Sequence, residues 1–109
     1  MNWSLKFLPE AVKDLKSLAG NQRIMVAKAI NKVLENPLPM QEGGYGKPLG
    51  NKSGNDLSGF LKIKLRSAGI RVVYKVYKTE TEMLVVVVGA RADDEVYEAA
   101  QHRIEKHNL

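Results

Sequence analysis

The chain has 109 residues, of which 44% are hydrophobic and 27% charged, and its formal net charge is +5. This length and composition predict one globular domain, spanning residues 1–109, that is large enough to bury a core. The absence of cysteine excludes disulfides and thiolate metal sites. The longest apolar run, Met83 to Val88, is too short to span a bilayer, and the N-terminus lacks the apolar core of a signal peptide. We therefore expect a cytoplasmic protein without membrane association.

The first third of the chain predicts a strand followed by two helices. Residues 2–7 alternate as a short strand does, and Pro9 suits the first turn of a helix. We expect Gly20 to end that helix and Asn21 to cap a second one, which runs to about Glu35. The two helices would form a compact αα-hairpin. The expected buried stripe of the second helix is Ile24, Ala27, Ile30, Val33 and Leu34.

Residues 36–59 differ from the rest of the chain in composition. They hold six of the nine glycines and three of the four prolines, without any periodicity. This composition predicts a long loop of the kind that is often functional or mobile. The Gly46-Lys47-Pro48 segment is not a phosphate-binding P-loop, because the required Gly-x4-Gly-Lys-Ser/Thr pattern is absent.

The last half of the chain predicts a β-hairpin, a third strand and a helix. The hairpin spans residues 61–77, and the uninterrupted apolar run at 83–90 indicates a central strand buried on both faces. Asp93 or Asp94 could cap a final helix over residues 95–107. Its thin apolar stripe predicts a weakly held, displaceable helix. That stripe comprises Val96, Ala99, Ala100 and Ile104.

The predicted hairpin has one apolar face and one cationic face. Side chains of a strand alternate between faces. In the first strand the cationic face therefore carries Lys62, Lys64 and Arg66. The second strand adds Arg71 and Lys75, and no carboxylate falls on this face of either strand. Like charges opposite each other destabilise a ladder, so the pattern suggests that the missing negative charge is a ligand, most simply a phosphate backbone.

Register fixes which cations would face each other. Keeping the apolar residues of both strands on one face predicts Arg66 opposite Arg71, with residues 67–70 as the connection. The same register pairs Lys64 with Val73.

Four motifs occur in a fixed order along the chain. They are Lys-Pro-Leu at 47–49, Lys-Ile-Lys-Leu-Arg at 62–66, Arg-Val-Val-Tyr at 71–74, and Val-Gly-Ala-Arg at 88–91 with Tyr97 six residues later. Together they resemble the RelE branch of the RelE/ParE superfamily of toxin–antitoxin toxins, as does the order of elements. The resemblance implies an α+β, RelE-like fold. Such a fold has a small, antiparallel-rich sheet of about four strands, packed by an N-terminal αα-hairpin, with a C-terminal helix.

The resemblance implies an endoribonuclease that cleaves mRNA in the ribosomal decoding site. Carried over residue by residue, it implicates as catalytic Lys62, Lys64, Arg71, Arg91 and Tyr97. The further residues expected to bind RNA are Lys47, Arg66 and Lys75. No cofactor is implied. The implied partners are a cognate antitoxin with an acidic, amphipathic segment, the ribosome with its mRNA, and operator DNA reached through the antitoxin complex.

Metal-free RNA cleavage uses the substrate's own 2′-OH as the nucleophile on the adjacent phosphate. Arg71 and Arg91 suit the stabilisation of the developing charge, because a guanidinium grips phosphate oxygens with paired donors. Lys64, made more acidic by cationic neighbours, is the expected base, or a further charge stabiliser if it keeps its proton. Tyr97 could stack on an unpaired base or orient a phosphate.

Simpler interpretations remain open for each of these residues. The lysines could form a solvated face, Arg91 could pair with Asp93 or Asp94, and Tyr97 could be a packing residue. His107, like the other histidine, is expected at the surface.

Two other functions remain open. One is a ParE-like, non-enzymatic inhibitor of DNA gyrase, against which the paired lysines argue. The other is a catalytically decayed module that binds RNA or an antitoxin.

Overall fold

The computed structural model describes residues 2–52, 54–90 and 93–109. The strands are β1 (Ser4–Phe7), β2 (Lys47–Lys52), β3 (Asn55–Leu65), β4 (Ile70–Tyr77) and β5 (Glu82–Gly89). The helices are α1 (Pro9–Lys16), α2 (Gly20–Leu34) and α3 (Asp93–Lys106), with short 3-10 turns η1 (Met40–Glu42) and η2 (Arg66–Ala68). The strands form one sheet in the order β1-β5-β4-β3-β2, in which only the β1–β5 pair is parallel.

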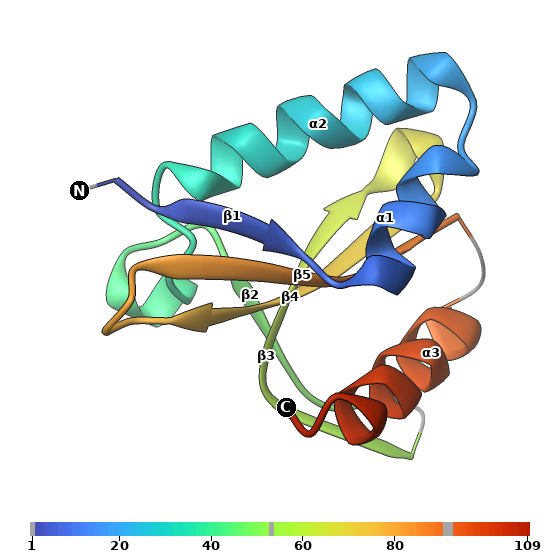
Figure 1. Cartoon of the computed structure of the whole chain (residues 1–109). Coiled ribbons are helices and arrows are strands. Elements are labelled where there is room, and N and C mark those ends of the chain that lie inside the picture. The colour runs from blue at the N-terminus through green and yellow to red at the C-terminus, as the bar shows by residue number, and fades with distance from the viewer. Residues whose placement is uncertain (1, 53, 91–92) are drawn as a thin grey trace.

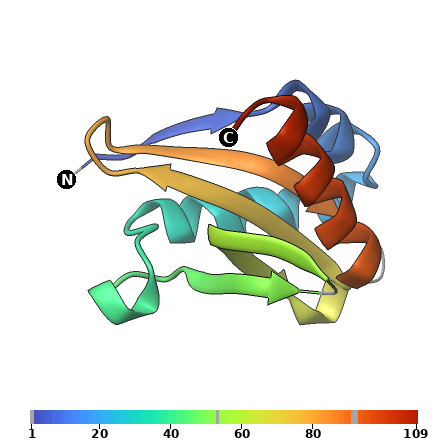
Figure 2. The same ribbon diagram turned by 90° about the horizontal axis from the view of Figure 1, so that it is seen from below.

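Helices cover both faces of this sheet. Figure 1 shows α2 above the sheet and α3 below it, and in Figure 2, seen from below, α3 lies in front of the strands and α2 behind them. Helix α1 packs against β5 and lies beside the C-terminal half of α3. The expected α+β architecture is confirmed, although the sheet has five strands where about four were expected.

The centre of the sheet is the best-buried part of the protein. All residues of β5 from Met83 to Gly89 are buried, as their apolar run predicts, and β5 lies between β1 and β4 in the strand order. The neighbouring Tyr74 is fully buried, and its hydroxyl donates a hydrogen bond of 2.9 Å to the Pro37 carbonyl oxygen. Burial raises the pKa of Tyr74 above its ordinary value, because the phenolate would lose its hydration. This hydrogen bond ties the segment after α2 to the sheet.

The boundary between the first two helices differs from the prediction. Gly20 is the first residue of α2 and not the end of α1, and Asn21 is not the N-cap. Ala19 occupies the N-cap position in an extended conformation, and its backbone N–H donates to the Gln22 side-chain oxygen at 3.2 Å. A side chain that returns to the cap backbone satisfies a helix end without a polar residue at the cap itself.

The buried stripe of α2 was also predicted with a wrong phase. Ile24 is 59% exposed and Ala27 is exposed, whereas Val26 is fully buried. Ile30 and Val33 are buried as expected. The helix therefore turns a face centred between Val26 and Ile30 toward the sheet, which leaves Ile24 on the solvent side.

The predicted loop over residues 36–59 is largely wrong. Its second half forms β2 and the first part of β3, an antiparallel hairpin with an irregularity between Pro48 and Gly50. Leu49 and Leu57, two apolar residues in this polar stretch, are buried. Strand β2 could not be predicted from periodicity, because the irregularity breaks the alternation of its side chains between the two faces of the sheet.

Helix α3 keeps the expected apolar stripe. Val96 and Ala100 are fully buried, and Ala99 and Ile104 are partly buried against the core. Within residues 2–52, 54–90 and 93–109, no helix is long and apolar enough to cross a membrane.

Candidate functional site

The β3–β4 pair brings a lysine and an arginine face to face. Lys64 lies directly opposite Arg71, so the register differs by two residues from the predicted one, in which Lys64 faced Val73. The connection is the tight turn η2, closed by Gly69 in the left-handed region at φ 65°. Arg66 begins this turn and leaves the ladder, so it does not face Arg71. The alternation of faces was predicted correctly, because a shift of two preserves it.

Strand β2 adds a further cation that the loop prediction had left without a place. Lys47 lies directly opposite Lys62, on the same face of the sheet as the Lys64–Arg71 pair. We call Lys47, Lys62, Lys64 and Arg71 the cationic cluster. Lys47 is exposed and the other three are half-buried. Arg71 also donates from Nη1 to the Gly69 carbonyl oxygen at 3.3 Å.

Helix α3 packs on the same face as the cationic cluster. Gly89 lies opposite Arg71, and a Cβ atom at Gly89 would stand 2.6 Å from Val96 Cγ2. The missing side chain of Gly89 thus lets the helix approach the sheet next to Arg71. The following residue of the helix, Tyr97, is 3% exposed. With α3 in this position, the Tyr97 ring is part of the core and is not displayed to a ligand.

Arg91 and Lys75 are the remaining predicted site residues. Arg91 lies outside the described residues, so its expected pairing and its expected role stay predictions. The Lys75 ammonium lies 5.5 Å from the Phe60 ring centre and 5.0 Å from the Tyr77 ring centre, and it donates to the Leu109 backbone oxygen at 3.3 Å. These contacts hold Lys75 beside the sheet, where aromatic faces attract a cation.

Ion pairs to α1 hold the C-terminal half of α3. Arg103 grips Asp14 with two hydrogen bonds, Nη1 to Oδ2 at 2.6 Å and Nη2 to Oδ1 at 3.1 Å. Glu10 accepts from Lys106 Nζ at 3.0 Å, and both of its oxygens lie 2.9 Å from His107 Nε2.

These contacts bear on two expectations made from the sequence, namely a weakly held α3 and a surface-exposed His107. The bond to His107, with those from its own backbone and Lys106, lowers the pKa of Glu10 to about 2. The thin apolar stripe of α3 is therefore supplemented by charge pairs, and His107 is partly buried and not simply exposed.

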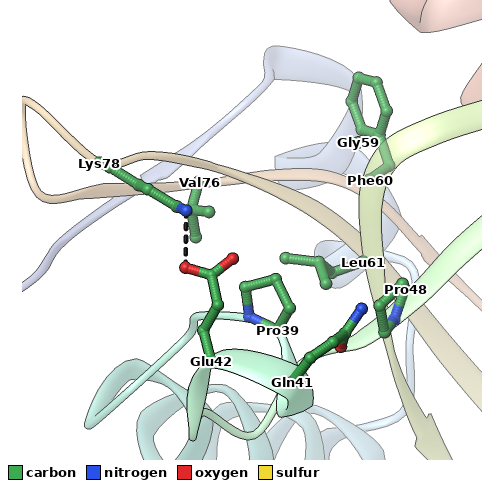
Figure 3. Close-up of a pocket in the computed structure, with 9 residues that line it drawn as sticks. All are labelled: Pro39, Gln41, Glu42, Pro48, Gly59, Phe60, Leu61, Val76 and Lys78. Atoms are coloured by element: carbon green, nitrogen blue, oxygen red, sulfur yellow. Dashed lines mark hydrogen bonds and ion pairs between the residues drawn. The ribbon is translucent and has the colours of Figure 1, made fainter.

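A pocket of about 340 Å³ lies between η1 and the strands β2, β3 and β4 (Figure 3). Apolar side chains including Pro39, Leu61 and Val76 line it, and Lys78 Nζ lies 2.6 Å from Glu42 Oε1. None of its lining residues belongs to the cationic cluster. We therefore treat it as a separate feature.

The cationic cluster has the chemistry of a phosphate-binding surface. Directly opposite residues of an antiparallel pair have Cβ atoms about 4.5–5.5 Å apart, so Lys64 and Arg71 can reach the same phosphate group. A guanidinium offers paired donors and an ammonium a compact charge. Sequence reasoning missed the Lys47–Lys62 pairing and the Asp14–Arg103 pair, because both depend on contacts between distant segments.

The fold and this surface define a small α+β protein with a cationic sheet face, and comparison with known proteins identifies its family. The family model of the ParE toxin of the type II toxin–antitoxin system parDE matches residues 5–95. The chain is 34% identical over 104 residues to the mRNA interferase toxin RelE of Escherichia coli strain K12, covering 95% of this chain and 99% of RelE. The chain therefore belongs to the RelE/ParE family of type II toxins.

Solved structures agree with this assignment. A variant of E. coli RelE in the free state matches with a TM-score of 0.74 and 32% identity, covering 95% of this chain and 99% of that one. RelE in the intact E. coli RelBE toxin–antitoxin complex matches with a TM-score of 0.63 and 30% identity, covering 83% of this chain and 98% of that one. The protein is thus a RelE-like toxin of a type II toxin–antitoxin system.

Proposed function

We propose that this toxin is a ribosome-dependent mRNA endonuclease that cleaves in the decoding site and so halts translation. The observation that carries the proposal is the direct pairing of Lys64 with Arg71 on a sheet face that also carries Lys62 and Lys47. The full-length similarity to a protein named mRNA interferase supports it. A protein that acts on ribosomes would work in the cytoplasm.

The proposed reaction needs neither a metal nor a cofactor. The 2′-oxygen of the mRNA attacks the adjacent phosphate, a 2′-O–P bond forms while the P–O5′ bond breaks, and the leaving 5′-oxygen takes up a proton from water. Arg71, with Arg91, stabilises the charge that develops on the phosphate. Lys64 takes the 2′ proton, or adds to charge stabilisation if it stays protonated. Lys62 and Lys47 extend the electrostatic surface along the RNA backbone.

Tyr97 has a conditional place in this proposal. Its ring is 3% exposed beneath α3, so it can stack on a nucleotide only if the helix shifts. If α3 stays in place, Tyr97 acts by packing in the core, next in sequence to the Val96 that contacts Gly89. A Tyr97→Phe variant in the experiment below tests the hydroxyl alone, because phenylalanine keeps both the packing and the stacking face.

The proposed partner is a cognate antitoxin, as in the complexes solved for related toxins. An acidic, amphipathic antitoxin segment would complement the cationic cluster and neutralise it. Binding of the toxin–antitoxin complex to operator DNA would then occur through the antitoxin.

The test is incubation of the purified protein with mRNA-programmed ribosomes, with naked mRNA as the control, followed by mapping of the cut ends. We expect cleavage on ribosomes only, reduced about 100-fold or more by Lys64→Ala. Lys28→Ala, which removes an exposed lysine of α2 on the far side of the sheet, is the matched control and should cleave like the wild type.

Other outcomes would replace the proposal. Intact mRNA together with inhibited DNA supercoiling by gyrase would favour the ParE-like function, which the description of the matching family model makes the leading alternative. Intact mRNA, active gyrase and retained binding of RNA or antitoxin would indicate a decayed binding module. Equal cleavage of naked and ribosome-bound mRNA would show that the activity does not depend on the ribosome.

A further inference from the structure

The outer edge of β5 changes its partner halfway along the strand. Strand β1 pairs with β5 only at residues 82–85, and the Leu8 N–H then donates to the Val85 carbonyl oxygen at 3.0 Å before α1 begins. On the other edge, pairing with β4 continues to Gly89. Beyond Val85, therefore, no strand of the described chain borders this edge of β5.

Two charged side chains take the place of the missing strand. The Val88 N–H donates to Asp14 Oδ2 at 3.0 Å, and Arg103 Nη1 donates to the Val86 carbonyl oxygen at 2.9 Å. Asp14 and Arg103 are also bonded to each other twice, and each side chain is 12% exposed. The pair thus supplies one acceptor and one donor to the strand edge, as a neighbouring strand would.

The end of β5 that this pair holds is the end that borders the cationic cluster. Gly89 follows Val88 directly, lies opposite Arg71 in the ladder, and receives Val96 of α3 in the space of its absent side chain. Arg103 belongs to the same helix as Val96 and Tyr97. One part-buried ion pair therefore ties α1, the end of β5 and α3 together beside Arg71.

We infer that Asp14 and Arg103 are positioning residues for the cleavage reaction. They fix the position of Gly89, which lies opposite Arg71, and the position of the helix that carries Tyr97. This inference rests on the proposed function. The pair touches no substrate in this arrangement; it fixes the strand end and the helix against which the cationic cluster is aligned. Misplacement of reacting groups by about 1 Å can lower a rate by about 100-fold, so loss of the pair should slow cleavage without weakening ribosome binding.

The test measures cleavage on programmed ribosomes for Asp14→Asn and Arg103→Lys, well below each variant's unfolding temperature. We expect kcat to fall between about 10- and 100-fold with KM unchanged. Glu10→Gln is the matched control, because Glu10 joins the same two helices but contacts none of the β5 backbone groups that the pair holds. Backbone amide NMR signals of Arg71 and Gly89 should shift in the pair variants and stay in place in Glu10→Gln.

Each result decides the inference. Folded pair variants with wild-type kcat, or with unshifted Arg71 and Gly89 signals, would overturn it and leave a purely structural ion pair. If neither pair variant folds, Gly89→Ala decides, because its Cβ pushes Val96 and disturbs the contact beside Arg71 without replacing either charged side chain; a wild-type kcat in that variant would also overturn the inference. A wild-type protein that leaves ribosomal mRNA intact would instead refute the proposed function, and the NMR arm would still report on positioning.

Discussion

The cationic cluster and the contact between α1 and α3 arrange their charged side chains in opposite ways. In the cluster, cations lie opposite cations, Lys64 against Arg71 and Lys47 against Lys62. Between the helices, cations meet carboxylates, with Arg103 on Asp14 at the centre. Like charges on facing strands destabilise a sheet, whereas a largely buried ion pair that also bonds to a strand edge holds its elements together. This contrast supports the proposal that the first arrangement binds an anion, whereas the second holds the fold together.

The largest expected effect comes from breaking the helix contact at Asp14. Asp14→Ala leaves the Arg103 guanidinium largely buried without its carboxylate partner and removes the acceptor of the Val88 N–H, so the free energy of unfolding should fall by about 3 kcal/mol. Urea unfolding measures it, with Glu10→Ala as the control, which should lose clearly less. Equal losses in the two variants would contradict the central place given to Asp14.

The next largest effect is expected in the cluster. Arg71→Ala should lower cleavage on ribosomes by about 100-fold, because one guanidinium that grips a phosphate in the transition state contributes about this much. The same variant should lose far less stability than Asp14→Ala. A cut rate within a few-fold of the wild type, measured in single-turnover reactions, would exclude a catalytic role for Arg71.

The buried, uncharged hydrogen bond of Tyr74 gives a reference for the effects expected in both regions, on stability and on cleavage. Tyr74→Phe removes the donor to the Pro37 carbonyl oxygen and should lower the free energy of unfolding by about 1–2 kcal/mol without changing the cut rate. Paired urea titrations and cleavage assays check this. A large loss of cleavage would mean that the segment after α2 shapes the site.

The smallest effect is a dependence of stability on pH. The pKa of Glu10 is about 2 in the folded protein, below its ordinary value of 4.5, so its ion pairs stabilise the fold above pH 4.5. That contribution should be lost as pH falls from about 4.5 toward 2, because the unfolded state then binds the proton more readily. Urea unfolding between pH 5 and pH 2 should show a shallower decline for Glu10→Gln, and parallel curves would contradict the assignment.

The fold was predictable where local pattern and tertiary role agree. The apolar run at 83–88 predicts the central strand, and the alternation of Leu61 to Leu65 predicts which lysines share a face. The phase of α2 and the existence of β2 were not predictable. Ile24 is apolar but exposed, and the alternation of β2 is broken near Gly50.

The cationic cluster was predictable by residue type but not by geometry. A shift of two residues leaves the pattern of faces unchanged, so the sequence could not distinguish Lys64 opposite Arg71 from Lys64 opposite Val73. The turn η2 determines the register of β3 and β4, because it closes the hairpin within residues 66–69. The Asp14–Arg103 pair joins residues 89 positions apart, and each alone is typical of a solvated helix face.

The most direct test of this account is to measure cleavage and stability on the same preparation of Lys64→Gln. The account predicts that cleavage of ribosomal mRNA is lost by about 100-fold, while the free energy of unfolding stays constant or rises by up to about 1 kcal/mol as the Lys64–Arg71 repulsion is relieved. A variant that cleaves normally but unfolds more easily would contradict it, because the lysine would then serve the fold and not the RNA.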